Sequence, residues 1–459
     1  MRKLCLGGLI ALFGMSLMAC GGGGGTSPVL TPTSSTSPMV VTVGDAPLNG
    51  ILSAEVTLSA VNLINGSTSV SVLSKPKQVE LSGLGVVHEP LELTTVATGS
   101  YTGVSVTVSA AQVTYLDPAS GSPVEAAATL VNPTTTITFT PPLTVTSKAG
   151  ADLLLDFDLS KSFDLTNGAV TFTPVIKTVA ASLDNENDDA KTVHLTGKVT
   201  ALTATSLTVL TEDSSTPVTF TVNANTKFDE DLSLSALQTG SIVTVQGVTQ
   251  TDGTILATEI EANDKGANED KNHHGGEGLV VAVTRDSTGA LTALQMVTRG
   301  SFESDHLGKT LTVNIDSHTQ FKLSEAAKKA GMLVFDATQI FPGQAINISG
   351  MAEDDHTAAA TEIRPAALAL HGQLAAAVQG TAPNYTYSLQ LGPKAAFAIL
   401  AKTLTVNGAT NSNTRYESDQ LTAASFPGLK TGANLTVRGY ATLGGGALTF
   451  LTNRVRQED

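Results

Sequence analysis

Apolar and small polar residues alternate along most of the chain after residue 38. The alternation is clearest at 40–43, 55–61, 104–108 and 136–140, and a period of two is typical of strands with one buried face. Valine and threonine, which favour strands, fill many of these positions. Helical periodicity is confined to short stretches, 324–332 and 394–402 at most. The pattern therefore predicts an all-β protein.

A repeated set of landmarks divides the second half of the chain into three units of about ninety residues. The landmarks are an opening glycine (Gly197, Gly278, Gly372), a Val-Asn pair (222–223, 313–314, 406–407), a Thr-x-Phe/Tyr motif (226–228, 319–321, 414–416), a pair of glycines (Gly240 with Gly247, Gly343 with Gly350, Gly432 with Gly439) and a closing hairpin and strand. Their constant order predicts three copies of one domain, at 193–262, 277–367 and 368–459.

The glycines indicate what that domain is. A glycine inside a strand commonly marks a bulge or a barrel corner, and Asp252-Gly253 is a tight-hairpin dipeptide. A closed barrel of five or six strands, similar to an OB fold, satisfies these signals and leaves no exposed edge. The second unit carries an insertion around 324–336, and the third lacks the Ala-Thr-Glu-Ile ending of the other two.

Residues 39–182 form a different unit. It opens on Asp-Ala-Pro at 45–47, continues through Gly-Ser-Tyr at 99–101 and closes on Asp-Phe-Asp at 156–158. This order resembles a domain of unknown function of the 4382 type, found in bacterial lipoproteins, and the repeats resemble a second such domain, of the 5666 type. The first resemblance implies a β-sandwich, and neither implies an activity. The expected fold is a β-sandwich followed by three OB-like barrels in a row.

The first twenty residues predict export and lipidation. Arg2 and Lys3 precede an apolar run at 4–17, too short to span a bilayer and typical of a signal segment. The run ends in Leu-Met-Ala-Cys at 17–20, which resembles the lipobox of bacterial lipoproteins. That resemblance implies removal of residues 1–19 and acyl chains, such as palmitate, on Cys20. The alternative is an ordinary signal peptide that contains a cysteine.

The residues that follow are expected to be a tether. Five glycines at 21–25 and a Ser-, Thr- and Pro-rich stretch up to residue 38 cannot bury a core. Gly21 rather than Asp follows Cys20, which by resemblance favours the bacterial outer membrane, with the domains facing the periplasm or the cell surface. Polar linkers are expected at 183–192 and 263–276.

Composition excludes several kinds of chemistry. The cysteines are Cys5, inside the signal segment, and Cys20, so the mature chain has no thiol for disulfides, metal sites or nucleophilic catalysis. A net charge of −15 argues against nucleic acid as a partner. The chain has no tryptophan, and only 4% of its residues are aromatic. This composition argues against a glycan-binding surface of stacked rings, for which only tyrosines such as Tyr385, Tyr387, Tyr416 and Tyr440 remain.

Asp45, Asp156 and Asp158 are the carboxylates we single out for a functional cluster. Paired carboxylates can hydrolyse glycosides when they are held at a suitable separation. However, an Asp before Ala-Pro also suits an Asx-turn. Asp156 and Asp158 flank Phe157 and are expected to point together to the outward face of a strand. A structural role is therefore the stronger interpretation.

Two further clusters favour linkers over metal sites. Asp184, Glu186 and Asp188 have the alternate spacing of a calcium loop, but Asp189 and Leu195 stand where that loop needs glycine and glutamate. A second candidate cluster comprises Glu269, Asp270, His273 and His274. It lies on a glycine-containing segment, which would not fix the orientation of the side chains that a metal needs. We therefore expect neither a metal nor another cofactor.

The sequence lacks the motifs of common hydrolases, phosphate-binding loops and dinucleotide sites. The expected function is that of a non-enzymatic interaction or scaffold protein of the cell envelope, attached to the membrane through Cys20. An envelope protein or a glycan is the expected kind of partner. A glycan- or peptide-binding module is the first alternative, with tyrosines on a concave face. A hydrolase acting through Asp45, Asp156 and Asp158 is the second, and it requires these carboxyls to converge in one cleft.

Overall fold

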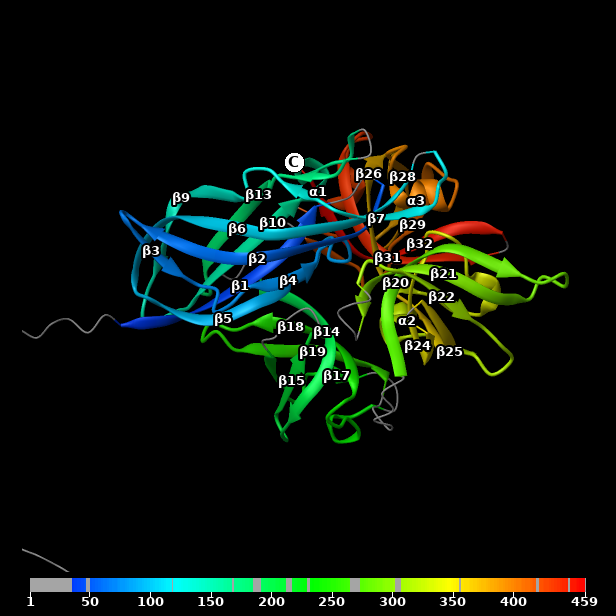
Figure 1. Cartoon of the computed structure of the whole chain (residues 1–459), viewed down its shortest axis with the longest axis horizontal. Coiled ribbons are helices and arrows are strands. Elements are labelled where there is room, and N and C mark those ends of the chain that lie inside the picture. Colours follow the sequence, from blue (N-terminus) through cyan, green and yellow to red (C-terminus); the bar gives the residue numbers. More distant parts are fainter. Residues whose placement is uncertain are drawn as a thin grey trace, which may run out of the picture. The chain divides into compact units, whose positions relative to one another are not determined.

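The N-terminal domain is a β-sandwich of two main sheets (Figure 1). The computed structural model describes residues 35–46, 50–117, 119–166, 169–184, 191–211, 217–228, 232–264, 273–301, 307–354, 356–417, 421–444 and 446–458. One sheet has the order β13-β10-β1-β5, and the other is built on β3-β2-β6-β7, with β4 paired to β2 and β9 to β6. A small third sheet has the order β11-β12-β8.

The elements of this domain follow one another closely along the chain. They are β1 (Thr36–Ala46), β2 (Ile51–Asn65), β3 (Thr68–Ser71), β4 (Lys77–Glu80), β5 (Glu89–Ala97), β6 (Gly99–Leu116), β7 (Pro123–Ala127), β8 (Thr129–Leu130), β9 (Thr134–Val145), β10 (Ala151–Asp158), α1 (Leu159–Ser162), β11 (Phe163–Asp164), β12 (Thr171–Phe172) and β13 (Ile176–Ser182).

The alternating pattern explains how the two sheets pack. In β10, Leu153, Leu155 and Phe157 are fully buried in the core shared with β2 and β6. Asp152 and Asp156 alternate with them and therefore point to the opposite face of the sheet. β1 runs parallel to β10, with Val43 opposite Leu155, so its apolar residues enter the same core.

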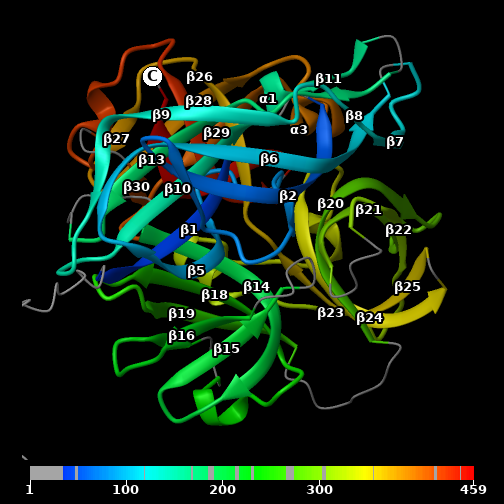
Figure 2. The same ribbon diagram turned by 60° about the vertical axis from the view of Figure 1, so that its left-hand side comes forward.

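Each of the three following domains is a closed five-stranded barrel, confirming the predicted OB-like fold. In the first, the chain of pairings β16-β15-β14-β18-β19 is closed by parallel pairing of β16 with β19. The second closes in the same way through β22 and β25, as Figure 2 shows, and the third through β29 and β32. An extra short strand pairs with the last strand of each barrel. The strand order is therefore the same in all three.

The first barrel consists of β14 (Thr192–Leu202), β15 (Ser206–Leu210), β16 (Val218–Thr221), β17 (Lys227–Phe228), the 3-10 turn η3 (Leu234–Ala236), β18 (Ile242–Thr249) and β19 (Ile255–Asp264). The second consists of β20 (His273–Arg285), β21 (Leu291–Ser301), β22 (Thr310–Asn314), β23 (Gln320–Phe321), α2 (Glu325–Ala330), η5 (Ala337–Gln339), β24 (Ala345–Asp354) and β25 (Thr357–Pro365). The insertion predicted around 324–336 thus contains α2.

The third barrel contains the second stretch with helical periodicity, as α3. It consists of β26 (Leu368–Leu374), β27 (Gln379–Thr381), β28 (Asn384–Leu391), α3 (Ala396–Leu400), β29 (Thr405–Ala409), β30 (Arg415–Glu417), η6 (Phe426–Gly428), β31 (Asn434–Gly444) and β32 (Ala447–Gln457).

The repeated glycines have the structural roles that the pattern predicts. The pairing register shifts at Gly247, Gly350 and Gly439, which places a bulge at the same point of each barrel. A Cβ at Gly350 would lie 2.2 Å from the carbonyl oxygen of Ala359 on the neighbouring strand. No side chain fits there, so glycine is required.

The threonine of the Thr-x-Phe/Tyr motif closes each barrel with a hydrogen bond that the sequence did not predict. Its hydroxyl donates to a carbonyl of the last strand: Thr226 to Ala257 at 2.8 Å, Thr319 to Ala360 at 2.8 Å, and Thr414 to Thr452 at 2.7 Å. The threonine is therefore as much a part of the repeat as the glycines.

The barrels do not stand in a row. Each contacts the sandwich: Val193 of the first pairs with His88, Arg299 of the second binds the carbonyl of Leu52, and Arg438 of the third binds that of Gly83. The barrels also contact one another, because Arg364 donates to Ala262 and Gln344 to Ala441. Residues from Thr36 onward form one compact unit. The expectation of a linear array was wrong because buried polar contacts between domains leave no local sequence signal.

Several sequence predictions lie outside the described residues. These are the signal segment, Cys20 and most of the tether up to residue 38, as well as residues 185–190 and 265–272 of the two linkers. The backbone of His273 and His274 belongs to β20, whereas their side chains are not described. Among the described residues, no helix is long and apolar enough to cross a bilayer.

Candidate functional site

Asp45 lies near the end of β1 and enters the interior of the protein. It pairs with Phe157 of β10, so its side chain lies on the core side of the sheet. Asp45 is only 2% exposed, and its Oδ1 has no hydrogen-bond partner in the described structure. Burial raises the pKa of Asp45 well above its usual range, and the nearby carboxyls of Asp156 and Glu80 raise it further.

Asp158 serves as the N-cap of α1. Its side chain accepts hydrogen bonds from the backbone nitrogen of Lys161 and the hydroxyl of Ser160, and it forms an ion pair with the ammonium of Lys161. Burial opposes ionisation, but these hydrogen bonds and the charge of Lys161 hold the pKa of Asp158 below its usual value. Its hydrogen-bonding capacity is therefore largely used inside the protein.

Asp156 shares a sheet face with Asp158, as predicted from their spacing, but that face is not open to solvent. Burial raises the pKa of Asp156, and the positive charge of Arg456 on the last strand of the third barrel opposes this shift. The third barrel therefore lies close to this face of the sandwich.

A cleft of about 360 Å³ lies between the sandwich and the third barrel, with the second barrel at its end. Asp45 and Asp158 both line this cleft, whereas Asp156 does not. The structure thus brings two of the three predicted carboxyls to one cavity. Its lining also includes polar or charged groups from all three of these domains: Ser82, Ser160, Lys161, Lys177, Arg299, His371, Asn434 and Glu458.

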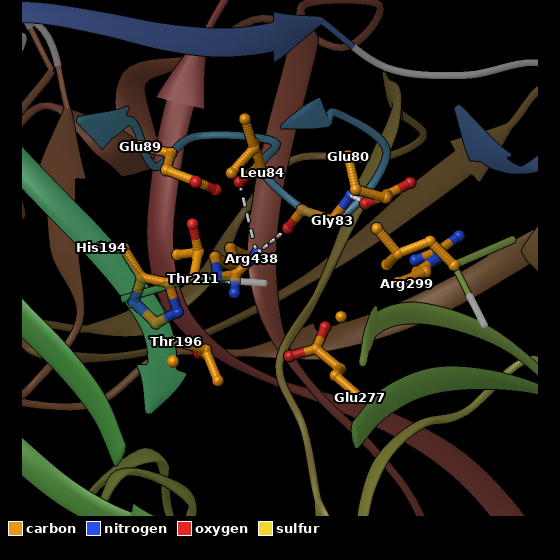
Figure 3. A pocket seen from close by; sticks show the side chains of 13 residues that line it. Glu80, Gly83, Leu84, Glu89, His194, Thr196, Thr211, Glu277, Arg299 and Arg438 are labelled. Atoms are coloured by element: carbon orange, nitrogen blue, oxygen red, sulfur yellow. Dashed lines mark hydrogen bonds between the residues drawn. The ribbon is translucent and has the colours of Figure 1, made fainter. Parts of the chain in front are cut away.

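A second, smaller cavity, of about 80 Å³, lies where all four domains meet (Figure 3). We call four of the charged residues around it the polar junction: Glu80, Glu277, Arg299 and Arg438. In Figure 3, Glu277 lies below and between the two arginines. Burial raises the pKa of Glu277, while the charges of Arg438 and Arg299 oppose the shift.

Hydrogen bonds fix the polar junction to the sandwich. Arg438 donates through Nη1 to the carbonyl of Gly83 at 2.7 Å, and Arg299 donates through Nε to that of Leu52 at 2.6 Å. Glu80 accepts from the backbone nitrogens of Ala54 at 3.0 Å and Gly83 at 3.1 Å. These bonds compensate for burying the charged groups, so the junction is suited to holding domains together.

His194 completes the wall of this cavity from the first barrel. Burial lowers the pKa of His194 to about 3, and the positive charges of Arg438 and Arg454 contribute to the shift. The imidazole is therefore neutral at physiological pH, and it does not act as a pH switch near pH 6.

The sequence did not point to the junction residues, although one signal was present. The residue before the bulge glycine is Gln246 in the first barrel, Ser349 in the second and Arg438 in the third. An arginine at that repeat position in a strand pattern is unusual enough to have marked Arg438. Nothing comparable distinguishes Glu80 or Glu277.

The tyrosines expected on a concave face are in the core instead. Tyr385 and Tyr387 are each 4% exposed and, like Tyr416, lie against the ring of Phe426, with centroids 5.5 to 5.9 Å apart. Tyr440 is also buried. That expectation was wrong because alternation alone does not say which face of a barrel strand points inward, and rings fill the barrel interior.

Comparisons with known proteins agree with this division of the chain. Residues 36–174 match a domain of unknown function, DUF4382, and residues 196–261 match another, DUF5666. No curated protein matches the chain.

Among solved structures, the chain is similar to wild-type single-stranded DNA binding protein from Thermus aquaticus, at 14% identity and a TM-score of 0.17, over 41% of this chain and 93% of that one. It is also similar to drosophila Unr CSD456, at 12% identity and a TM-score of 0.13, over 59% and 98%. The family matches thus follow the order DUF4382, then DUF5666, along the chain, and the second and third barrels have the same strand order as the barrel that matches DUF5666.

Proposed function

We propose that the chain is a non-enzymatic interaction protein of the bacterial cell envelope, attached to a membrane by lipid on Cys20. The observation that carries this proposal is the set of contacts that fix the sandwich to the barrels. The polar junction binds the second and third barrels, and the backbone bridge between His88 and Val193 binds the first. A sandwich that follows the tether and holds three barrels in fixed positions is suited to presenting surfaces to partners.

The state of the carboxyls supports a non-enzymatic role. A glycosidase needs two carboxyl groups facing the substrate. In the cleft, Asp158 is bonded to Lys161, and Glu458 to Arg456 and Thr436. Of these three carboxyls, only Asp45 has an oxygen without a hydrogen-bond partner in the described structure, so we do not propose hydrolysis.

The exposed loop after α2 is where we would look for a partner. Leu333 is 88% exposed and Val334 56% exposed, which is unusual for two adjacent large apolar residues. The loop belongs to the insertion in the second barrel.

The first test concerns the anchor. A mass spectrum of the chain purified from host membranes should show a mature N-terminus at Cys20 with two or three acyl chains. The Cys20→Ser variant should be unprocessed or released from the membrane. An unlipidated wild-type chain in the soluble fraction would overturn the attachment.

The second test concerns the interaction. A photo-crosslinking amino acid at position 333 of the lipidated chain should give one reproducible adduct in host cells, whereas the same group at the exposed Thr219 of the first barrel should not. The adduct should disappear with Cys20→Ser. Equal labelling at both positions would contradict a specific contact.

A further inference from the structure

The cleft between the sandwich and the third barrel has the size of a ligand site. Its volume of about 360 Å³ falls within the range of roughly 300–1,000 Å³ that is typical of small-molecule pockets. Residues from the sandwich and from the second and third barrels line it. Such positions between domains are common places for ligands.

One acceptor on the wall of the cleft is unused. Asp45 is 2% exposed, and its Oδ1 has no hydrogen-bond partner in the described structure. An unsatisfied buried oxygen destabilises a protein by about 1–3 kcal/mol. Asp45 lines the cleft, so a ligand donor that reached this oxygen would remove that penalty.

The other acidic groups of the cleft are already engaged. Asp158 is bonded to Ser160 and Lys161, and Glu458 accepts from Thr436 at 2.6 Å and pairs with Arg456 at 2.9 Å. A ligand donor would have to displace these bonds. Asp45 offers an oxygen without such competition.

The charges around Asp45 favour a cation. Among the charges that shift the pKa of Asp45, the carboxyls of Asp156, Glu80 and Asp158 raise it and the guanidinium of Arg299 lowers it. Of the lysines that line the cleft, Lys161 is already paired with Asp158. An ammonium would be attracted to this position, and a carboxylate or phosphate would be repelled. The net charge of −15 acts in the same direction.

Much of the remaining lining is apolar. Leu368, Leu370, Leu391 and Phe397 of the third barrel are each about 4% exposed, and together with Leu279 of the second barrel they line the cleft. Their side chains offer a surface for a hydrocarbon group. The site is therefore polar at Asp45 and apolar on the side of the third barrel.

We propose that this cleft binds a small amphiphilic primary amine, whose ammonium group donates to Asp45 and whose hydrocarbon part packs against the leucines and Phe397 of the third barrel. This inference goes beyond the scaffold role and does not depend on lipidation. A free alkylamine and the head group of an aminophospholipid share this chemistry.

Binding should release a proton. Without ligand, the raised pKa favours the neutral carboxyl of Asp45, and an adjacent ammonium favours the ionised form. The affinity should therefore increase as the pH rises through the pKa of free Asp45, provided that the amine remains protonated.

The test is isothermal titration calorimetry of the full-length chain in detergent, with hexylamine as the probe and hexanol and hexanoate as matched controls. Hexylamine should bind at least tenfold more tightly than either control and more tightly at pH 7.5 than at pH 5. Titrations in two buffers of different ionisation enthalpy should show proton release. Equal affinity for the three probes, or no binding at millimolar hexylamine, would overturn the proposal.

Variants identify the site. Asp45→Asn should weaken hexylamine binding at least tenfold, while Asp164→Asn, an exposed aspartate outside the cleft, should not. Unchanged binding to Asp45→Asn would overturn the proposal. If Asp45→Asn does not fold, the wild-type chain provides the test. Tighter hexylamine binding at pH 7.5 with proton release would support the proposal, and binding without either would overturn it.

A soluble phosphatidylethanolamine with short acyl chains separates the two sources of the amine. Displacement of hexylamine by this lipid assigns the site to a lipid head group. Binding of hexylamine without such displacement assigns it to a free amine.

Discussion

The polar junction and the cleft both bury carboxyl groups between domains, but the carboxyl groups have different surroundings in the two places. In the junction, Glu277 lies between two arginines and Glu80 accepts backbone hydrogen bonds. In the cleft, one oxygen of Asp45 has no hydrogen-bond partner in the described structure, and burial together with the neighbouring carboxylates raises the pKa of Asp45. Compensated charges hold domains together, whereas an uncompensated one lowers stability and leaves an acceptor for a ligand.

The largest effect should come from breaking the junction. Arg438→Ala removes the hydrogen bonds to the sandwich and leaves Glu277 without one of its two cations. The free energy of unfolding should fall by about 3–5 kcal/mol, as it does when one partner of a buried ion pair is lost. Chemical denaturation measures it.

Arg415→Ala is the matched control, because Arg415 is exposed on β30 of the same barrel. It should change the stability by less than about 0.5 kcal/mol. If the two arginine variants lose similar amounts, the junction does not hold the domains together.

Asp45 and Asp158 should respond to substitution with opposite signs near neutral pH. Asp45→Asn should stabilise the protein by about 1 kcal/mol because it removes a buried, uncompensated carboxyl. Asp158→Ala should destabilise it by about 1 kcal/mol through loss of the N-cap. Thermal and denaturant unfolding at pH 7 measure both, and effects of the same sign would contradict the contrast.

The pH dependence sharpens the same comparison. The folded-state pKa of Asp45 is raised, so the folded form binds more protons, and its contribution to stability falls as the pH rises from the unfolded value near 4 through the folded pKa. Asp158 has a lowered folded-state pKa, so its contribution is present above pH 4 and is lost as the pH falls through the folded pKa. Asp45→Asn should therefore gain stability over the wild type as the pH rises, and a constant difference would contradict this.

The last prediction concerns the barrel threonine, whose loss should have an effect no larger than those of the two aspartates. Thr414→Val removes the hydrogen bond to Thr452 and that from the backbone nitrogen of Asn411, which should lower the free energy of unfolding by about 1 kcal/mol. Thr226→Val and Thr319→Val should behave alike, because the bonds are equivalent in the other barrels. A loss in one barrel alone would show that the motif has different roles.

The fold could be predicted because its determinants are local. Gly350 and Gly439 are required by close backbone approach within one pair of strands, and a Cβ at Gly247, at the equivalent bulge, would lie 2.8 Å from the side chain of Ile255. The bulge of each barrel therefore appears in the sequence as a glycine at the same position of each repeat.

The site could be predicted only in part. Asp45 and Asp158 were found through short motifs, but the engagement of Asp158 by Lys161 and the isolation of Asp45 depend on how domains pack. Glu277, Arg299 and Arg438 come from strands far apart in the chain. Their proximity depends on contacts between whole barrels, which alternation of apolar and polar residues does not encode.

The parallel pairing that closes the third barrel also affects the cleft. In the third barrel, β29 pairs with β32. The same strand carries Arg454, which hydrogen-bonds Glu417, and Arg456, which pairs with Glu458 at the cleft. Because β32 closes the third barrel and leads directly into Glu458 on the wall of the cleft, a chain without β32 would lose the barrel closure and that part of the wall together.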